Sequence, residues 1–249
     1  MGMTLGFSGD GGIWTPAAIG GASLWLRPDL GLTVDGSSLT TNWVNQVGAK
    51  QSLIVPSGKT GPLYSATSGI NGTPGLTFNG TSDCLYTTTA VWAADATKVV
   101  IVVASLSSGN ISILTSRLKN GFYHDFMTYT LSGSTQIITS DCVAVNDTVA
   151  MTEAEIFIPA HFRWDYTTGG STVVFRFNND LKTVSGGNLS AETSISAGIA
   201  VGGRVDASGG VDGGTYMKGV LCEIIGTTGI ISTGDWAAFR TYANKRYGL

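Results

Sequence analysis

Glu153 and Glu155 are the pair of carboxylates in this sequence whose spacing best suits catalysis. Side chains two residues apart on a β-strand point to the same face, so the two carboxylates would lie roughly 6.5–7 Å apart. That separation is near the border between retaining and inverting glycoside hydrolases, which place two carboxylates beside the scissile bond. The spacing by itself therefore raises glycoside hydrolysis as one candidate chemistry.

The histidines are weaker candidates for catalysis. His124 precedes Asp125, and His161 lies in a separate apolar segment. No Gly-x-Ser-x-Gly nucleophile turn and no reactive-cysteine motif accompanies them. We therefore expect both histidines to be structural.

One loop has acidic residues at its ends. Asp206 and Asp212 flank a Ser-Gly-Gly segment that could curl oxygen atoms around calcium. Their spacing does not match an EF-hand loop, and a hairpin tip is the more ordinary explanation. We expect no bound metal and no cofactor.

The cysteines also lack the pattern of a metal or disulfide framework. They are odd in number, far apart and without the paired spacing of a zinc site: Cys84, Cys142 and Cys222. We expect three buried free thiols.

Aromatic side chains could instead stack on sugars. Trp92, Trp164 and Tyr216 are the candidates. Because aromatic residues of a β-sandwich are more often buried than exposed, we assign no glycan-binding residues from the sequence.

The composition combines an ample core with a surface poor in charge. Hydrophobic residues make up 43% of the chain and charged residues only 12%. Since most surfaces carry more charge than this, we interpret part of the surface as covered by partners. A net charge of −3 does not indicate binding to nucleic acid or to an anionic membrane, because both are negatively charged.

The first 22 residues are predicted to form an N-terminal arm outside the folded domain. They are rich in Gly, and their apolar residues follow neither a helical nor a strand period: Leu5, Phe7, Ile13 and Trp14. These residues are too few to form a core, so we expect them to bind a partner. The sequence shows no signal-peptide pattern and no apolar run long enough to span a membrane, which predicts synthesis in the cytoplasm without membrane insertion.

The last residues predict a helix over residues 232–247. Ser232 and Asp235 suit a capping box, and Lys245 and Arg246 suit the C-terminal end of the helix dipole. Trp236 and Phe239 would dock this helix on a sheet.

Strands and turns account for the rest of the chain. Residues 99–103 form a continuous apolar run that suits a strand buried on both faces. The predicted strands are residues 22–26, 75–78, 98–106, 111–116, 121–131, 135–139, 156–166, 172–178, 197–203 and 217–225.

Four stretches together resemble a known fold family. They are residues 23–29 with 34–36 and 42–46, residues 72–85, residues 202–203 with 218–225, and the closing helix. These stretches resemble the laminin-G-like jelly roll of the concanavalin A-like lectin/glucanase superfamily. The resemblance implies an all-β fold, a two-sheet antiparallel jelly-roll sandwich with one C-terminal helix, over residues 23–249, preceded by the arm of residues 1–22.

The same resemblance guides the expected function. Hydrolases of this superfamily typically show a third acid close to the first two, whereas here Glu155 is followed by Ile156, Phe157 and Ile158. We therefore expect no catalytic residues and no enzyme activity.

The segment of residues 14–18, which precedes the predicted domain, resembles the corresponding segment of tailed-phage structural proteins. This favours a structural virion protein: a capsid decoration, head-fibre or tail-associated subunit, displayed in several copies and bound to other virion subunits by its arm. A carbohydrate-binding adhesion module for host-surface glycans is the alternative, and a glycoside hydrolase is the third.

Overall fold

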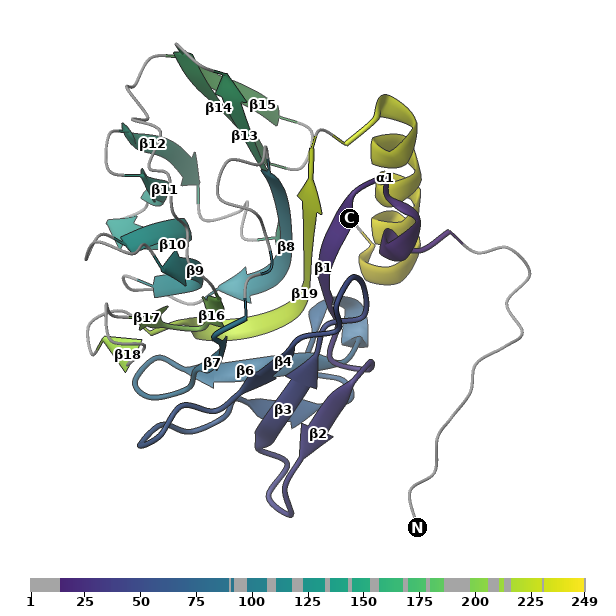
Figure 1. Ribbon diagram of the computed structural model, residues 1–249, viewed down its shortest axis with the longest axis vertical. Coiled ribbons are helices and arrows are strands. Elements are labelled where there is room, and N and C mark those ends of the chain that lie inside the picture. Colours follow the sequence, from purple (N-terminus) through teal and green to yellow (C-terminus); the bar gives the residue numbers. More distant parts are fainter. Residues whose placement is uncertain are drawn as a thin grey trace.

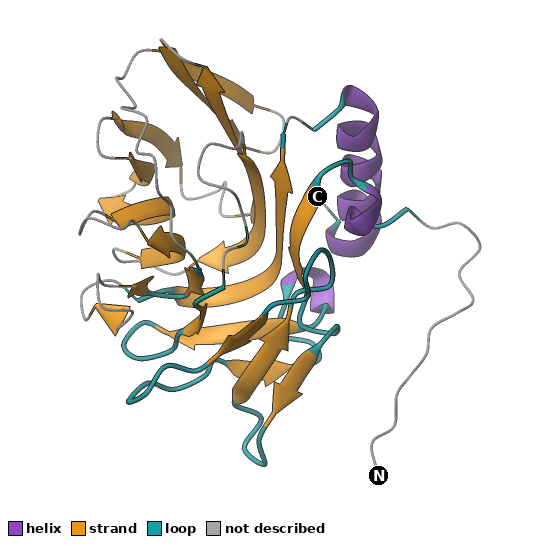
Figure 2. Ribbon diagram, in the orientation of Figure 1, coloured by secondary structure: helices purple, strands orange, loops and turns teal. Residues whose placement is uncertain are grey.

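The computed structural model describes residues 14–89, 91, 98–106, 111–117, 123–132, 135–142, 145–152, 157–167, 170–177, 180–185, 198–205, 211–212, 216–229 and 231–248. Within these ranges the chain consists mainly of strands, with one α-helix close to its C-terminal end (Figure 2). Two short 3₁₀ turns, η1 (Pro16–Ala18) and η2 (Ile70–Gly72), occur in the first third.

The first of two large antiparallel sheets is built around the long strand β19 (Lys218–Thr228), and we call it the β19 sheet. In the described ranges it has eight strands, the others being β1 (Ala22–Leu26), β5 (Leu63–Ser65), β6 (Gly75–Asn79), β8 (Lys98–Leu106), β13 (Phe157–Thr167), β14 (Gly170–Phe177) and β15 (Asp180–Ser185). Their spatial order is β15-β14-β13-β8-β19-β6-β5, and β1 pairs with β19 beyond the end of β6 (Figure 1).

The second sheet, which we call the β7 sheet, has nine strands in the described ranges. They are β2 (Leu32–Val34), β3 (Thr40–Val44), β4 (Ser52–Ile54), β7 (Leu85–Thr87), β9 (Ile111–Arg117), β10 (Tyr123–Ser132), β11 (Thr135–Cys142), β12 (Val145–Thr152) and β16 (Ile199–Val201). Their order is β12-β11-β10-β9-β16-β7-β4-β3-β2. A separate small pair joins β17 (Arg204–Val205) to β18 (Val211–Asp212).

The core between the sheets follows from alternation along the strands. Leu76 and Phe78 share one face of β6 and are both buried. Trp43 and Leu53, which are directly opposed on β3 and β4, are buried from the other sheet. Each sheet therefore turns one apolar face toward its partner, as a β-sandwich requires.

Strand β8 is buried on both faces, as its continuous apolar run predicts. It lies between β13 and β19, so both of its edges are hydrogen-bonded. Val102 and Val103 alternate in direction along the strand, and both are buried. Val103 belongs to a cluster on the outer face of the β19 sheet.

A bulge in β19 sets which residues point to that outer face. Leu221 pairs with Ala104 and Glu223 pairs with Val103, so Cys222 is the extra residue. Beyond the bulge, Glu223 and Ile225 share the outer face.

The helix α1 (Thr233–Tyr247) begins and ends where its caps predict. The Ser232 hydroxyl accepts a hydrogen bond from the Asp235 backbone N–H at 3.0 Å, which satisfies one of the free donors of the first turn. At the other end Gly248 adopts φ 72°, and its N–H donates to the Asn244 carbonyl at 2.9 Å.

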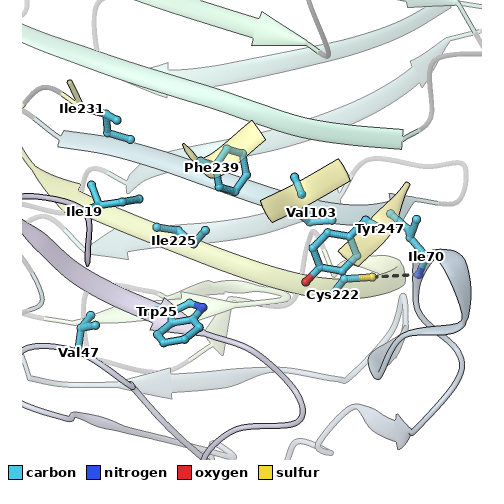
Figure 3. Close-up of a cluster of buried hydrophobic side chains, with 11 residues drawn as sticks. Ile19, Trp25, Val47, Ile70, Val103, Cys222, Ile225, Ile231, Phe239 and Tyr247 are labelled. Carbon is cyan, nitrogen blue, oxygen red and sulfur yellow. Dashed lines mark hydrogen bonds between the residues drawn. The ribbon is translucent and has the colours of Figure 1, made fainter. Parts of the chain in front are cut away.

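α1 packs on the outer face of the β19 sheet (Figures 1 and 3). Phe239, Ala243 and Tyr247 recur every four residues and are buried there. Trp236 is partly buried at the edge of the same cluster, which also contains Trp25 and Ile225. Both aromatic residues expected to dock the helix therefore contact the sheet.

The predicted fold class is confirmed: the protein is a two-sheet antiparallel β-sandwich with one C-terminal helix. The predicted strands correspond to β1, β6, β8, β9, β10, β11, β13, β14, β16 and β19, with shifts of a few residues at most ends. The strands that were not predicted are mostly short or polar: β2, β3, β4, β5, β7, β12, β15, β17 and β18.

Candidate functional site

The first candidate is a carboxylate enclosed between the β19 sheet and α1. Glu223 is 0% exposed. Its Oε1 accepts hydrogen bonds from Trp25 Nε1 at 2.6 Å and from the Tyr242 hydroxyl at 2.8 Å. Its Oε2 accepts from the Tyr247 hydroxyl at 2.8 Å. Two strands and the helix therefore converge on this single side chain.

Two arginines extend this arrangement into a closed ring. Arg27 Nη1 donates to the Tyr242 hydroxyl at 3.1 Å, and Arg246 Nε donates to the Tyr247 hydroxyl at 3.2 Å. Asp29 then accepts from both guanidinium groups, from Arg27 Nε at 2.6 Å and from Arg246 Nη2 at 2.9 Å. We call these residues, with the buried carboxylate, the helix ring.

The helix ring is suited to holding α1 rather than to chemistry on a substrate. Burial raises the pKa of Glu223, while the hydrogen bonds from Trp25, Tyr247 and Tyr242 act in the opposite direction. A group without solvent exposure cannot reach a glycosidic bond. The ring therefore accounts for a buried acid in an apolar strand but supplies no active site.

The second candidate lies on the outer face of the β7 sheet, the face turned away from the β19 sheet. Directly opposed residues of neighbouring antiparallel strands share one face. The strand register aligns one such row across seven strands, and we call it the Tyr86 row. From β2 to β10 it runs through Thr33, Asn42, Ile54, Tyr86, Ala200, Thr115 and Asp125.

The middle of the Tyr86 row combines apolar and polar side chains. Ile54 is 47% exposed, an unusual value for isoleucine in a sheet. Asn42 and Tyr86 flank it and are partly exposed. The Asn42 Oδ1 atom is buried and has no hydrogen-bond partner among the described residues.

A lysine and a second tyrosine lie beside the row. Tyr86 packs against a small cluster formed by Cys84, Ala200 and Tyr216. The Lys59 Nζ lies 5.1 Å from the centroid of the Tyr216 ring and contacts the Tyr216 hydroxyl. Burial raises the pKa of the Cys84 thiol to about 12, so this thiol stays protonated and unreactive at neutral pH.

The turn that precedes Cys84 is held by an acid. Asp83 Oδ2 accepts from the Asn79 backbone N–H at 2.8 Å, and Asp83 Oδ1 accepts from the Thr60 hydroxyl at 2.6 Å. Gly80 has φ 81°, which glycine adopts without strain. Side-chain hydrogen bonds from Asp83 therefore hold this turn in place.

Seven of the residues singled out in the sequence lie outside the described residues. These are Leu5, Phe7, Ile13, Trp92, Glu153, Glu155 and Asp206. Trp14 is described: it is partly buried, and its ring contacts Tyr242 of the same chain with the centroids 6.0 Å apart.

The histidines are placed only by their backbones. His124 lies on β10 opposite Ser116, and His161 lies on β13 opposite Ile101. The register therefore puts them on different sheets, whereas Asp125 belongs to the Tyr86 row.

Most of this face is not evident from the sequence. Tyr216 is one of the stacking candidates that the sequence offers, but Lys59, Asn42, Ile54 and Tyr86 carry no such signal. The last three lie on strands too short to give an alternating pattern, so no periodic signal could have marked their outward face.

Comparisons with known proteins identify the fold. No family model matches the sequence, and no curated protein matches it. Among solved structures, a mutant GH54 α-L-arabinofuranosidase soaked with 4-nitrophenyl α-L-arabinofuranoside is similar, with a TM-score of 0.57 and 14% identity over 93% of this chain. An arabinofuranosidase complexed with arabinofuranosyl-α-1,2-xylobiose has a TM-score of 0.56 and 14% identity over 84% of this chain.

The likeness is one of fold. This chain spans 60% of the length of the first of these enzymes and 50% of the second. At this identity the similarity establishes a shared β-sandwich, and nothing in the comparisons links the chain to a phage protein or to a laminin-G domain.

These comparisons correct the expected function. The interpretation as a non-enzymatic structural virion protein is wrong, because the similar sandwiches are carbohydrate-active enzymes. That interpretation depends on a charge-poor surface and on the short segment of residues 14–18. Neither feature distinguishes among the different functions that proteins of one fold can have.

Two features are absent from the described residues. No group of three or more metal-ligating side chains occurs among them. No helix in the described ranges is long and apolar enough to cross a membrane.

Proposed function

We propose that this chain is a carbohydrate-active protein that binds a glycan on the Tyr86 row and hydrolyses a glycosidic bond. The observation that carries the proposal is the likeness of its sandwich, over 93% of the chain, to an arabinofuranosidase. An α-L-arabinofuranoside is the first substrate class to test, because that enzyme was soaked with one.

The Tyr86 row has the surface that sugar binding requires. A sugar ring has an apolar face that packs on aromatic and aliphatic side chains, and Tyr86 and Ile54 offer such contacts side by side. Asn42, next along the row, is partly exposed and carries amide N–H donors for hydroxyl groups. From Asn42 through Ile54 to Tyr86 the row crosses two strand spacings, about 10 Å, which suits a short oligosaccharide. Beyond Tyr86, Ala200 is buried in a cluster with Tyr216.

Hydrolysis requires two carboxyl groups near the scissile bond. Asp125 is the carboxylic residue of the Tyr86 row, three strands from Tyr86. We therefore propose Asp125 as the first acid to test. The pair Glu153 and Glu155 is the second choice, on its spacing in the sequence.

The test is sugar release by the full chain from 4-nitrophenyl α-L-arabinofuranoside and from a panel of other 4-nitrophenyl glycosides. We expect Asp125→Asn to lower kcat by at least 100-fold, since removal of a catalytic acid or base typically has this effect. The matched control is Asp180→Asn, at the edge of the other sheet, which should keep full activity. Absence of sugar release from every substrate would refute hydrolysis.

A second candidate function is carbohydrate binding without hydrolysis. It is favoured by the part of the row from β2 to β7, where Thr33, Asn42, Ile54 and Tyr86 include no carboxylate. Titration calorimetry with arabinofuranosyl-xylobiose would detect binding, and Tyr86→Ala should weaken it by at least tenfold. Binding without sugar release would select this second function.

A further inference from the structure

Lys59 is a partly buried cation next to the Tyr86 row. The ion pairs within the described residues involve Arg27, Arg246 and Asp29, and none of the described carboxylates lies within salt-bridge distance of Lys59. A lysine ammonium that is partly removed from water and lacks a counter-charge is a ready site for an anion.

The ammonium is held in place by its surroundings. Its Nζ lies over the Tyr216 ring, 5.1 Å from the centroid, and also contacts the Tyr216 hydroxyl. The Lys59 backbone N–H donates to the Pro56 carbonyl at 3.1 Å, which fixes the turn that carries the side chain. An ammonium has three donors, so donors remain for a ligand after the tyrosine contact.

Asp83, on the segment that pairs with Thr60, makes no ion pair with this ammonium. Asp83 is only 5% exposed, and its two oxygens accept from Asn79 and Thr60. Asp125, on the same row as Tyr86, is three strand spacings from it, about 14 Å. The Lys59 end of the row is therefore complementary to negative charge.

We propose that Lys59 and Tyr216 bind the carboxylate of an acidic sugar, while Tyr86 and Ile54 pack against the neighbouring sugar ring. This inference rests on the proposed function, since it names the class of glycan that the Tyr86 row takes. The carboxylate would accept charge-assisted hydrogen bonds from the ammonium. Hexuronates and sialic acids share this chemistry.

The test is titration calorimetry of the full chain with two matched pairs of glycans. The first pair is xylotriose carrying a 4-O-methylglucuronic acid branch and unbranched xylotriose. The second pair is 3′-sialyllactose and lactose. We expect one acidic glycan to bind at least tenfold more tightly than its neutral counterpart, and the pair that shows the difference identifies the source of the carboxylate. The preference should weaken as salt is raised.

Three variants assign the effect to the lysine. Lys59→Met keeps the length of the side chain and should abolish the preference for the acidic glycan without changing binding of the neutral one. Lys59→Arg keeps the charge and should retain most of the preference. Lys245→Met, on an exposed position of α1, is the matched control and should bind like the parent.

Each outcome separates the two proposals. Equal binding of acidic and neutral glycans, or an unchanged preference in Lys59→Met, would overturn the acidic-sugar inference and leave the proposed function standing. Failure of all four glycans to bind would overturn the inference, and failure of the arabinofuranosides as well would overturn the proposed function.

Discussion

Replacing Glu223 with alanine tests whether the helix ring fastens α1 to the sandwich. The substitution removes the shared acceptor of three buried donors, Trp25 Nε1 and the hydroxyls of Tyr242 and Tyr247. The hydroxyls cannot turn to the arginines for replacement, because guanidinium groups only donate. Each donor left unsatisfied costs about 1–3 kcal/mol, and removal of one member of a buried charged network typically costs about 3–5 kcal/mol.

We therefore expect Glu223→Ala to lower the free energy of unfolding by about 3–5 kcal/mol. Urea denaturation followed by tryptophan fluorescence measures this change. Glu223→Gln, which keeps one acceptor oxygen, should lose less, about 1–2 kcal/mol. If Glu223→Ala lost less than about 1 kcal/mol, the ring would contribute little to stability and the reasoning from unsatisfied donors would fail.

Three other perturbations probe the same structure. Burial raises the pKa of Glu223 above its ordinary value of 4.5, so the native state holds the proton more tightly than the unfolded chain. The stability of the parent relative to Glu223→Gln should therefore be greatest below about pH 4.5 and fall as pH rises through the raised pKa; a pH-independent difference in urea titrations would contradict this. Phe239→Ala removes a ring that is 1% exposed and should cost about 3–5 kcal/mol in the same assay, whereas a loss below about 1 kcal/mol would argue against a closed cluster. Gly198→Ala brings a Cβ within 2.0 Å of a carbonyl oxygen and should destabilise the fold far more than Gly58→Ala, which has positive φ but open space; equal melting temperatures would refute the close approach.

The helix was predictable because its ends are determined locally. Ser232 and Gly248 act through hydrogen bonds to residues three or four positions away, so the sequence contains the relevant partners. The long strands were predictable for a similar reason. The run of β8 is apolar on both faces because both faces are covered, and that is visible from consecutive residues.

The helix ring was not predictable. Glu223 appears in the sequence as one acid in an apolar strand, and its partners are far away: Trp25 is 198 positions distant and Tyr242 is 19 positions distant. The bulge at Cys222 also changes which residues of β19 face the helix, and no sequence pattern around Cys222 predicts this bulge.

The Tyr86 row was hidden for a third reason. Its members are brought together by register between strands of three to ten residues, and β4 with β7, β7 with β16 and β16 with β9 are neighbours that are not consecutive in the chain. Ala200, for example, lies between Tyr86 and Thr115. Periodicity within one segment cannot reveal such a neighbourhood.

The pairing of β1 with β19 has a consequence for how the protein reaches its fold. Ala22 is opposite Thr227, so the strand closes a loop of roughly two hundred residues. The closure entropy of a loop grows with the logarithm of its length and is offset only after the distant contacts form. During synthesis β1 lacks this partner until β19 has left the ribosome. The topology therefore implies a high contact order and slow folding, on the scale of about milliseconds to seconds, with α1 locked in place as a late event.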